Sequence, residues 1–229
     1  MTNRALTISL PLFLLLSACT SPQPTGRIAF SSDRDGNAEI YIINADGTGL
    51  ERLTYSPSSD TSPAWSPDGQ HIAYNQEFEC NLDICVMHTD GPPINLTGWP
   101  GAEGSPSWSP DGTRIAFSSD RDGNLEIYSI AADGTDPVNL TNNPAGDGTP
   151  SWSPDGDRIA FSSDRDGNLE IYVLHLVTGT VDRLTTGAGV DMGPAWSPDG
   201  ERIAFSTDGD HEIYLMNADG SALAQLTDN

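Results

Sequence analysis

A sequence repeat of about 44 residues occurs five times along this chain, and this repetition constrains the fold more than any other feature. A segment reading Arg-Ile-Ala-Phe, or a variant of it, recurs at spacings of 44, 43, 44 and 44 residues, with its Ile at Ile28, Ile72, Ile115, Ile159 and Ile203. Trp-Ser-Pro-Asp-Gly occurs four times, starting at Trp65, Trp108, Trp152 and Trp196. A period of this length is typical of propellers and solenoids, whose units bury their apolar faces against each other.

Each unit holds four short strand patterns separated by turn residues. From the axis outward they are represented by residues 63–66, 27–31, 39–44 and 50–54. Turn sequences such as Pro67-Asp68-Gly69 and Asp46-Gly47 separate them, with Gly supplying the positive φ of a tight turn. The 39–44 segment and its copies are apolar on both faces, as expected of strands covered on both sides. The sequence therefore predicts an all-β fold, a β-propeller of about five four-stranded blades.

The first blade is predicted to be incomplete. The repeats lie near residues 26–69, 70–112, 113–156, 157–200 and 201–229. The first of them has no Trp-containing strand before Arg27, which leaves 19 predicted strands. Residues 20–26 are one candidate for the missing strand, although they are two residues shorter than their counterpart, residues 61–69, and lack Trp. The alternatives are an open ring, a ring closed by self-association with another copy, or a truncated chain.

The first 25 residues are interpreted as a targeting signal followed by a tether. Residues 1–18 contain one Arg and a short apolar run of about 12 residues, too short to cross a bilayer. The sequence Leu16-Ser17-Ala18-Cys19 resembles the lipobox of bacterial lipoproteins, which implies cleavage before Cys19, acylation of its thiol and anchoring of the mature chain to a membrane. Residues 19–25 form a polar tether. The alternative is an ordinary secretory signal in which this Cys occurs by chance.

Charge and composition exclude several classes of function. The chain carries 10 Lys+Arg against 33 Asp+Glu, a formal charge of −23. Such a charge opposes binding to nucleic acid and electrostatic docking to anionic lipid. The 23 Gly and 17 Pro disfavour a helical bundle.

The repeat W-S-P-D-G-x-x-I-A-F-S-S-D-R-D-G-N-x-E-I-Y resembles that of the TolB-like propellers, also described as WD-repeat-like or Asp/Pro repeats, over residues 26–229. The resemblance implies a bacterial envelope propeller used for contacts with other proteins. The motif is specific for the fold and poorly specific for function. The chain departs from the family pattern in two ways: it lacks the separate N-terminal domain, and it has five repeats where that propeller has six.

An acid stands five residues before each repeated Trp, and the four acids are Asp60, Glu103, Asp147 and Asp191. If the innermost strands line a channel, these carboxylates form a ring at its mouth that would bind a cation, take up a proton or attract a basic partner segment. The alternative is that each acid caps its own loop. The repeated Trp residues are predicted to fill space between blades rather than to stack on a ligand.

Two weaker candidates remain. The loop Ser31–Gly36 and its copies half-fit a calcium loop, with Asp33, Asp35, Asp120, Asp122, Asp164 and Asp166 as the carboxylates, but Ser holds the first position and the twelfth is not Glu. An Asp-rich hairpin that bonds its own backbone explains the pattern equally well. Cys80 and Cys85 are a candidate disulfide if a turn separates them.

Three functions follow in order of support. The first is a lipid-anchored, non-enzymatic scaffold of the bacterial envelope that binds another protein through loops that vary between repeats. The second is a small-ligand or glycan binder at the channel mouth that uses Ca²⁺, the one cofactor considered. The third is a propeller hydrolase or lyase, for which the sequence shows no catalytic motif and no convergent set of His, carboxylate and nucleophile.

Overall fold

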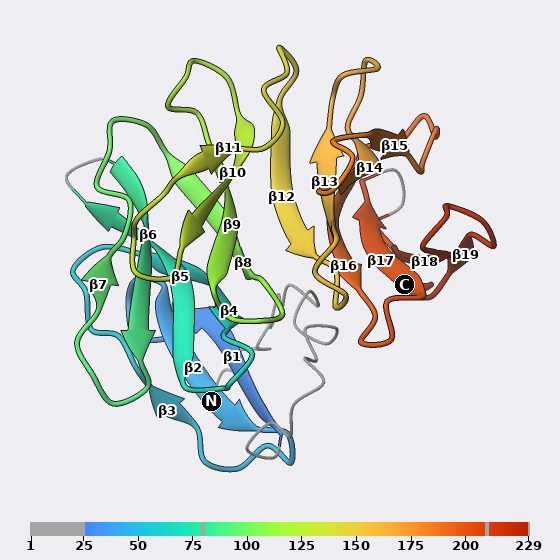
Figure 1. Cartoon of the computed structure of the whole chain (residues 1–229). Helices are drawn as coiled ribbons and strands as arrows, with labels where there is room; N and C mark the ends of the chain where they lie inside the picture. Colours follow the sequence, from blue (N-terminus) through green and yellow to red (C-terminus); the bar gives the residue numbers. More distant parts are fainter. Residues whose placement is uncertain (1–25, 79–80, 209–210, 229) are drawn as a thin grey trace.

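The computed structural model describes residues 26–78, 81–208 and 211–228, and all of its regular structure is β-strand. The strands form five antiparallel sheets arranged as the blades of a propeller (Figure 1). The first blade contains β1 (Arg27–Ser32), β2 (Glu39–Asn44) and β3 (Glu51–Arg52). The second contains β4 (Asp60–Trp65), β5 (His71–Phe78), β6 (Asn81–His88) and β7 (Ile94–Asn95).

The other three blades repeat the order of the second. The third contains β8 (Glu103–Trp108), β9 (Arg114–Ser119), β10 (Glu126–Ala131) and β11 (Val138–Asn139). The fourth contains β12 (Asp147–Trp152), β13 (Arg158–Ser163), β14 (Glu170–His175) and β15 (Val181–Arg183). The fifth contains β16 (Asp191–Trp196), β17 (Arg202–Thr207), β18 (Ile213–Asn217) and β19 (Ala224–Gln225). The prediction of an all-β propeller whose first blade has three strands is confirmed.

The innermost strand of each complete blade begins earlier than the sequence suggested. β4 starts at Asp60 rather than at Pro63, so the acid five residues before Trp65 is the first residue of the strand. The pairing of this strand with β5 is interrupted by a bulge between Thr61 and Ala64. The third residue of the innermost strands has a positive φ of 51° to 62°, at Ser62, Ser105, Thr149 and Gly193. The bulge contains the Ser-Pro, Thr-Pro or Gly-Pro step of each strand.

The hydrophobic core lies between blades. The layer between the fourth and fifth blades contains Ile171 and Val173 of β14 together with Trp196, Phe205 and Met216 of the fifth blade. Equivalent layers separate the other neighbouring blades. The third strand of the fourth blade, β14, is buried along almost its whole length. Apolar residues concentrated in these layers explain how a chain with 36% hydrophobic residues folds.

The repeated Trp side chains lie in these layers, as predicted. Each packs in a between-blade cluster. The indole Nε1 of Trp108 donates to the carbonyl oxygen of Ala64 in the preceding blade at 3.2 Å, and that of Trp196 donates to Ser151 at 3.1 Å. These bonds join successive innermost strands around the axis.

The first and fifth blades end the series. In the described residues no strand of the first blade packs extensively against a strand of the fifth, whereas the other neighbours do. The described chain contains no helix long and apolar enough to span a membrane.

The between-blade layers predict a position-dependent cost for the same substitution. Ile171→Ala removes a fully buried side chain and is expected to lower the free energy of unfolding by about 2–5 kcal/mol. Ile94→Ala, at a residue that is 65% exposed, is expected to change it by less than about 0.5 kcal/mol. Urea denaturation monitored by circular dichroism compares the two variants. Equal losses would show that stability does not depend on these layers.

Candidate functional site

The four acids of the predicted ring are buried in the structure, at the start of β4, β8, β12 and β16. Asp60 Oδ1 accepts a hydrogen bond from Gln76 Nε2 at 2.9 Å, and Glu103 Oε1 accepts one from Ser119 Oγ at 2.8 Å. The second oxygen of each, Asp60 Oδ2 and Glu103 Oε2, is buried without a hydrogen-bond partner. These carboxylates therefore do not face solvent, as a simple loop cap would.

A second set of buried acids was missed by the sequence reasoning. They are the acids of the Glu/Asp-Ile-Tyr motif, Glu39, Asp83, Glu126, Glu170 and Glu212. Thr54 Oγ1 donates to Glu39 Oε2 at 2.6 Å and accepts from the backbone N–H of Ile40 at 2.9 Å. The same relay links Thr185, Glu170 and Ile171. The signal was present in the repeated Leu-Thr and Glu-Ile-Tyr motifs, which were interpreted only as strand markers.

The two sets meet between neighbouring blades. Arg52 Nη2 donates to Glu39 Oε1 at 2.6 Å, while Asp60 of the next blade has no arginine partner. Burial, with an added contribution from the negative charge of Glu39, raises the pKa of Asp60 to about 6. Burial likewise raises the pKa of Glu103 to about 7, against the opposing effects of Ser119 and Arg121.

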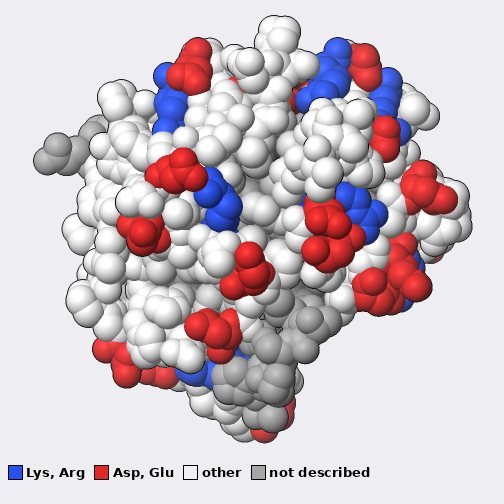
Figure 2. All heavy atoms as spheres, viewed as in Figure 1, with Lys and Arg blue, Asp and Glu red and all other residues white. Residues whose placement is uncertain are grey.

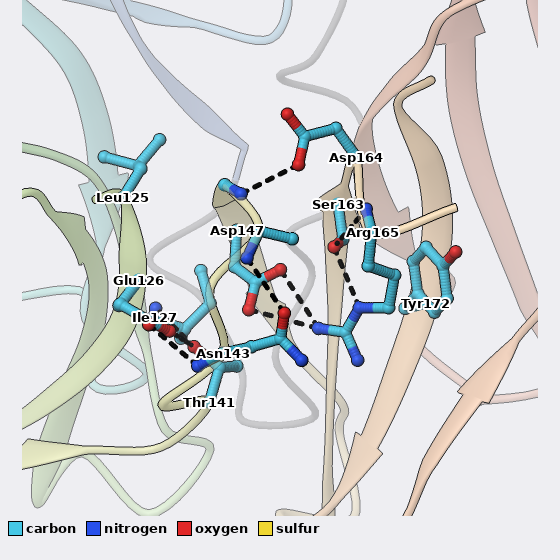
Figure 3. A network of polar contacts seen from close by, with 12 residues as sticks. Leu125, Glu126, Ile127, Thr141, Asn143, Asp147, Ser163, Asp164, Arg165 and Tyr172 are labelled. Carbon is cyan, nitrogen blue, oxygen red and sulfur yellow. Dashed lines mark hydrogen bonds and ion pairs between the residues drawn. The ribbon is translucent and has the colours of Figure 1, made fainter. Parts of the chain in front are cut away.

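In the fourth blade the buried carboxylate of the innermost strand, Asp147, forms an ion pair with an arginine (Figure 3). Arg165 Nη2 lies 3.0 Å from Asp147 Oδ1 and 3.1 Å from Oδ2, and Arg165 Nε donates to Ser163 Oγ at 2.9 Å. Its guanidinium also stacks over Tyr172, 4.7 Å from the ring centroid. The pKa of Asp147 is raised by burial, and Ser163 and Arg165 oppose that shift. Burial and the neighbouring Glu170 raise the pKa of Asp191 in the fifth blade.

In the candidate calcium loops, Asp side chains accept hydrogen bonds from nearby groups of the protein. Asp35 accepts from the Tyr41 hydroxyl at 2.5 Å, and Asp166 accepts from Tyr172 at 2.6 Å. Asp164 Oδ1 accepts from the backbone N–H of Gly146 at 2.8 Å, the contact seen in Figure 3. In the residues that the structure describes, no three His, Cys, Asp or Glu side chains are grouped to hold a metal ion. The two calcium hypotheses, for these loops and for the acidic ring, stay predictions.

The cysteines are placed only in part. Cys85 is buried on β6 and forms no disulfide with another described residue, and burial, with smaller effects from Asp83 and Asp60, raises its thiol pKa to about 12. Cys80 and Cys19 lie outside the described residues, as do the predicted signal and tether. The disulfide and the lipid anchor therefore stay predictions.

Two kinds of loop gather at one end of the blades. Antiparallel connectivity places the fourth-to-first strand loops and the second-to-third strand loops at the same end, and Asn side chains join them. Asn124 Nδ2, for example, donates to the carbonyl oxygens of Asn143 at 2.8 Å and Ala145 at 2.9 Å. We call this end the loop face. It exposes Tyr55, Leu125 and Met192. Acidic side chains are spread over the view in Figure 2, with arginines beside several of them.

The five sheets and their repeated turn sequences can be compared with known families. A family model described as the TolB beta propeller domain matches residues 16–103 and 94–191. The chain belongs to this family. Its five sheets are therefore the blades of a TolB beta propeller domain.

Similar proteins share the propeller over part of their length. The Tol-Pal system protein TolB of Desulfosudis oleivorans is 44% identical over 62 residues, which cover 27% of this chain and 14% of that protein. The uncharacterized peptidase YuxL of Bacillus subtilis is 45% identical over 51 residues, covering 21% of this chain and 8% of that protein. The crystal structure of TolB from Acinetobacter baumannii superposes with a TM-score of 0.76 at 27% identity, covering 88% of this chain and 53% of that one.

The raised pKa of Asp60 predicts a pH dependence. A carboxyl whose pKa is raised on folding binds its proton more tightly in the folded state, so stability falls as pH rises from the unfolded pKa near 4 to about 6 and stays low above it. Asp60→Asn is expected to remove about 1 kcal/mol of the loss between pH 5 and pH 7. Thermal unfolding across this range checks it, with the exposed Asp157→Asn as control. A slope unchanged by Asp60→Asn would contradict the prediction.

The Asp147–Arg165 pair predicts a difference between equivalent arginines. Arg165→Met leaves a buried carboxylate without its cation and is expected to cost about 3–5 kcal/mol. Arg34→Met, at the same repeat position of the first blade, breaks no ion pair of the described residues and is expected to cost less than half as much. Chemical denaturation of both variants measures the difference. Equal costs would mean that Arg165 stabilises the blade by stacking alone.

Proposed function

We propose that this protein is a lipid-anchored scaffold of the bacterial cell envelope that binds another protein through its loop face. The observation that carries the proposal is the contrast between its two parts. The strands and tight turns repeat almost unchanged, while the loops of 55–59, 98–102, 142–146 and 186–190 differ in every copy. Variable loops on a constant scaffold are where binding specificity resides.

The family supports the location and the kind of activity. The similar proteins from Desulfosudis and Acinetobacter are TolB proteins, one of them named as part of a Tol-Pal system, so an envelope partner is the first candidate for this chain. The lipobox-like sequence ending at Cys19 supports attachment to a membrane from the outside of the cytoplasm. This chain spans 14% of the first relative and 53% of the solved TolB chain, so the activities of those whole proteins are proposals here.

We infer that the propeller acts by binding and not by catalysis. The similarity to the uncharacterized peptidase YuxL covers 51 residues, which are 8% of that protein. Among the described histidines, His71 and His88 face each other edge to face on neighbouring strands, with ring centroids 5.3 Å apart, and His175 bonds Asp182. These residues lie at strand ends, and in the described residues no Ser or Cys side chain is hydrogen-bonded to their imidazole rings.

The loop face predicts where a partner can be crosslinked. A photoreactive amino acid in place of Tyr55, which is 74% exposed on the loop face, is expected to give a discrete adduct with one envelope protein in living cells. The same amino acid in place of Val177, which is 84% exposed in the turn at the other end of the blades, is the control and is expected to give none. Adducts from Val177 alone, or from neither site, would overturn the proposal.

A further inference from the structure

The inner edge of β1 is uncovered in the described residues, whereas its four counterparts are covered. β5, β9, β13 and β17 each pair with the innermost strand of their own blade. β1 pairs only with β2 among the described strands. Phe30, Ser31 and Ser32 are half-buried, while the equivalent residues of β9 and β13 are buried. The backbone N–H and C=O groups along this edge therefore have no partner strand among the described residues.

Arg34 is held beside this edge in the conformation of its counterpart, Arg165. Arg34 Nε donates to Ser32 Oγ at 2.9 Å, and its guanidinium lies 4.8 Å from the Tyr41 ring centroid and 5.3 Å from that of Phe30. Arg165 has the same contacts and adds the pair with Asp147, on the strand beside it, while Arg121 of the third blade stacks on Phe117 and Tyr128 without an ion pair to Glu103 among the described residues. No described carboxylate is paired with Arg34. The arginine is thus positioned for an acid that the covering strand would carry.

A second polar group at this edge also lacks the contact that its counterparts make. In the third, fourth and fifth blades the first Asp of the hairpin accepts the N–H of the residue just before the innermost strand. Asp120 accepts from Ala102 at 2.7 Å, and Asp208 accepts from Val190 at 2.8 Å. Asp33 occupies this position beside β1, with no such donor among the described residues.

The indole of Trp65 is the third polar group near this edge that lacks the contact made by some of its counterparts. Of the three Trp residues that follow a complete blade, Trp108 and Trp196 donate from Nε1 to a carbonyl oxygen of the innermost strand of that blade, and Trp152 donates to Gly156 of its own turn. For Trp65 the preceding blade is the first one, and its Nε1 is buried without a hydrogen-bond partner. A strand on β1 would bring a carbonyl oxygen to this indole, which removes the cost of a buried unpaired donor.

We propose that the inner edge of β1 is a docking site for an extended segment of another protein that begins with Asp or Glu. The register follows from the complete blades. The acid lies opposite Ser32, as Asp147 lies opposite Ser163, and the sixth residue lies opposite Ile28, as Trp152 lies opposite Ile159. The third residue adopts positive φ, which favours Gly, Asn or Ser, and Pro fits at the fourth. Main-chain bonds supply affinity, and Arg34 selects the acid.

The charge of the site favours a separate protein over the alternatives within this chain. Residues 20–25, Thr-Ser-Pro-Gln-Pro-Thr, contain no carboxylate to pair with Arg34. The innermost strands of a second copy are already paired within their own blades. With a formal charge of −23 on the chain, the segment is expected to carry one acid among uncharged residues. Asp33 and Arg34 lie in a second-to-third strand loop of the loop face and the docking edge runs along β1, so the edge adjoins the loop face and is tested through residues other than Tyr55.

The experiment uses the full chain and a fluorescent peptide with the sequence of residues 58–66, Ser-Ser-Asp-Thr-Ser-Pro-Ala-Trp-Ser, measured by fluorescence anisotropy. We expect saturable binding that weakens at least tenfold with Arg34→Gln and also when Asn replaces the peptide's Asp. The two changes together are expected to cost no more than either alone, because they remove the same pair. Arg202→Gln, which removes a positive charge at an exposed position on the fifth blade, is the matched control and is expected to bind normally.

Four results would overturn the proposal. They are the absence of saturable binding, equal binding of the Asp and Asn peptides, equal weakening by Arg34→Gln and Arg202→Gln, and self-association of the chain that the peptide does not reverse. The Asn peptide tests the unaltered protein, so the comparison holds even if Arg34→Gln unfolds. Crosslinking from Tyr55 is measured in parallel, and its persistence when the peptide fails separates the loss of this site from the loss of the loop face.

Discussion

Burial of each blade against its neighbour is the interaction on which the rest of this structure depends. No single sheet has a core of its own, because its apolar residues lie on the two faces that contact adjacent sheets. The layers are completed by Trp side chains that cross from one innermost strand to the next. Stability is therefore shared along the series of blades, and the first and last faces differ from the inner ones.

Many acidic side chains are buried in these blades. Each repeat places one carboxylate at the start of its third strand, and each complete blade has another at the start of its innermost strand. Threonine hydroxyls and arginines stabilise the first set, while the second set uses Gln, Ser or Arg, depending on the blade. Because two negative charges at a dry interface repel each other, protonation stabilises part of this arrangement. The stability of the propeller is thus coupled to pH in the mildly acidic range.

The first blade contains both the incomplete contacts and the proposed docking edge. It has the groups that bond an innermost strand elsewhere, and the described residues supply no such strand. The repetition of the sequence makes the missing contacts countable, because each has a satisfied counterpart in another blade. In the two proposals, a partner is held by the variable loops and an extended segment by the inner edge of β1.

The sequence by itself determined the repeat, the four-strand unit, the turn positions and the incomplete first blade, because period, Gly positions and β-patterning are local properties of the chain. It also located the acids before each Trp. Only the tertiary structure decided that these acids are buried beside a second set and that arginine neutralises Asp147 but not Asp60. Those outcomes depend on which residues neighbouring blades bring together, across separations that strand patterns do not encode. The unpaired state of Trp65 and Arg34 emerged in the same way, from comparing positions that only the folded blades make equivalent.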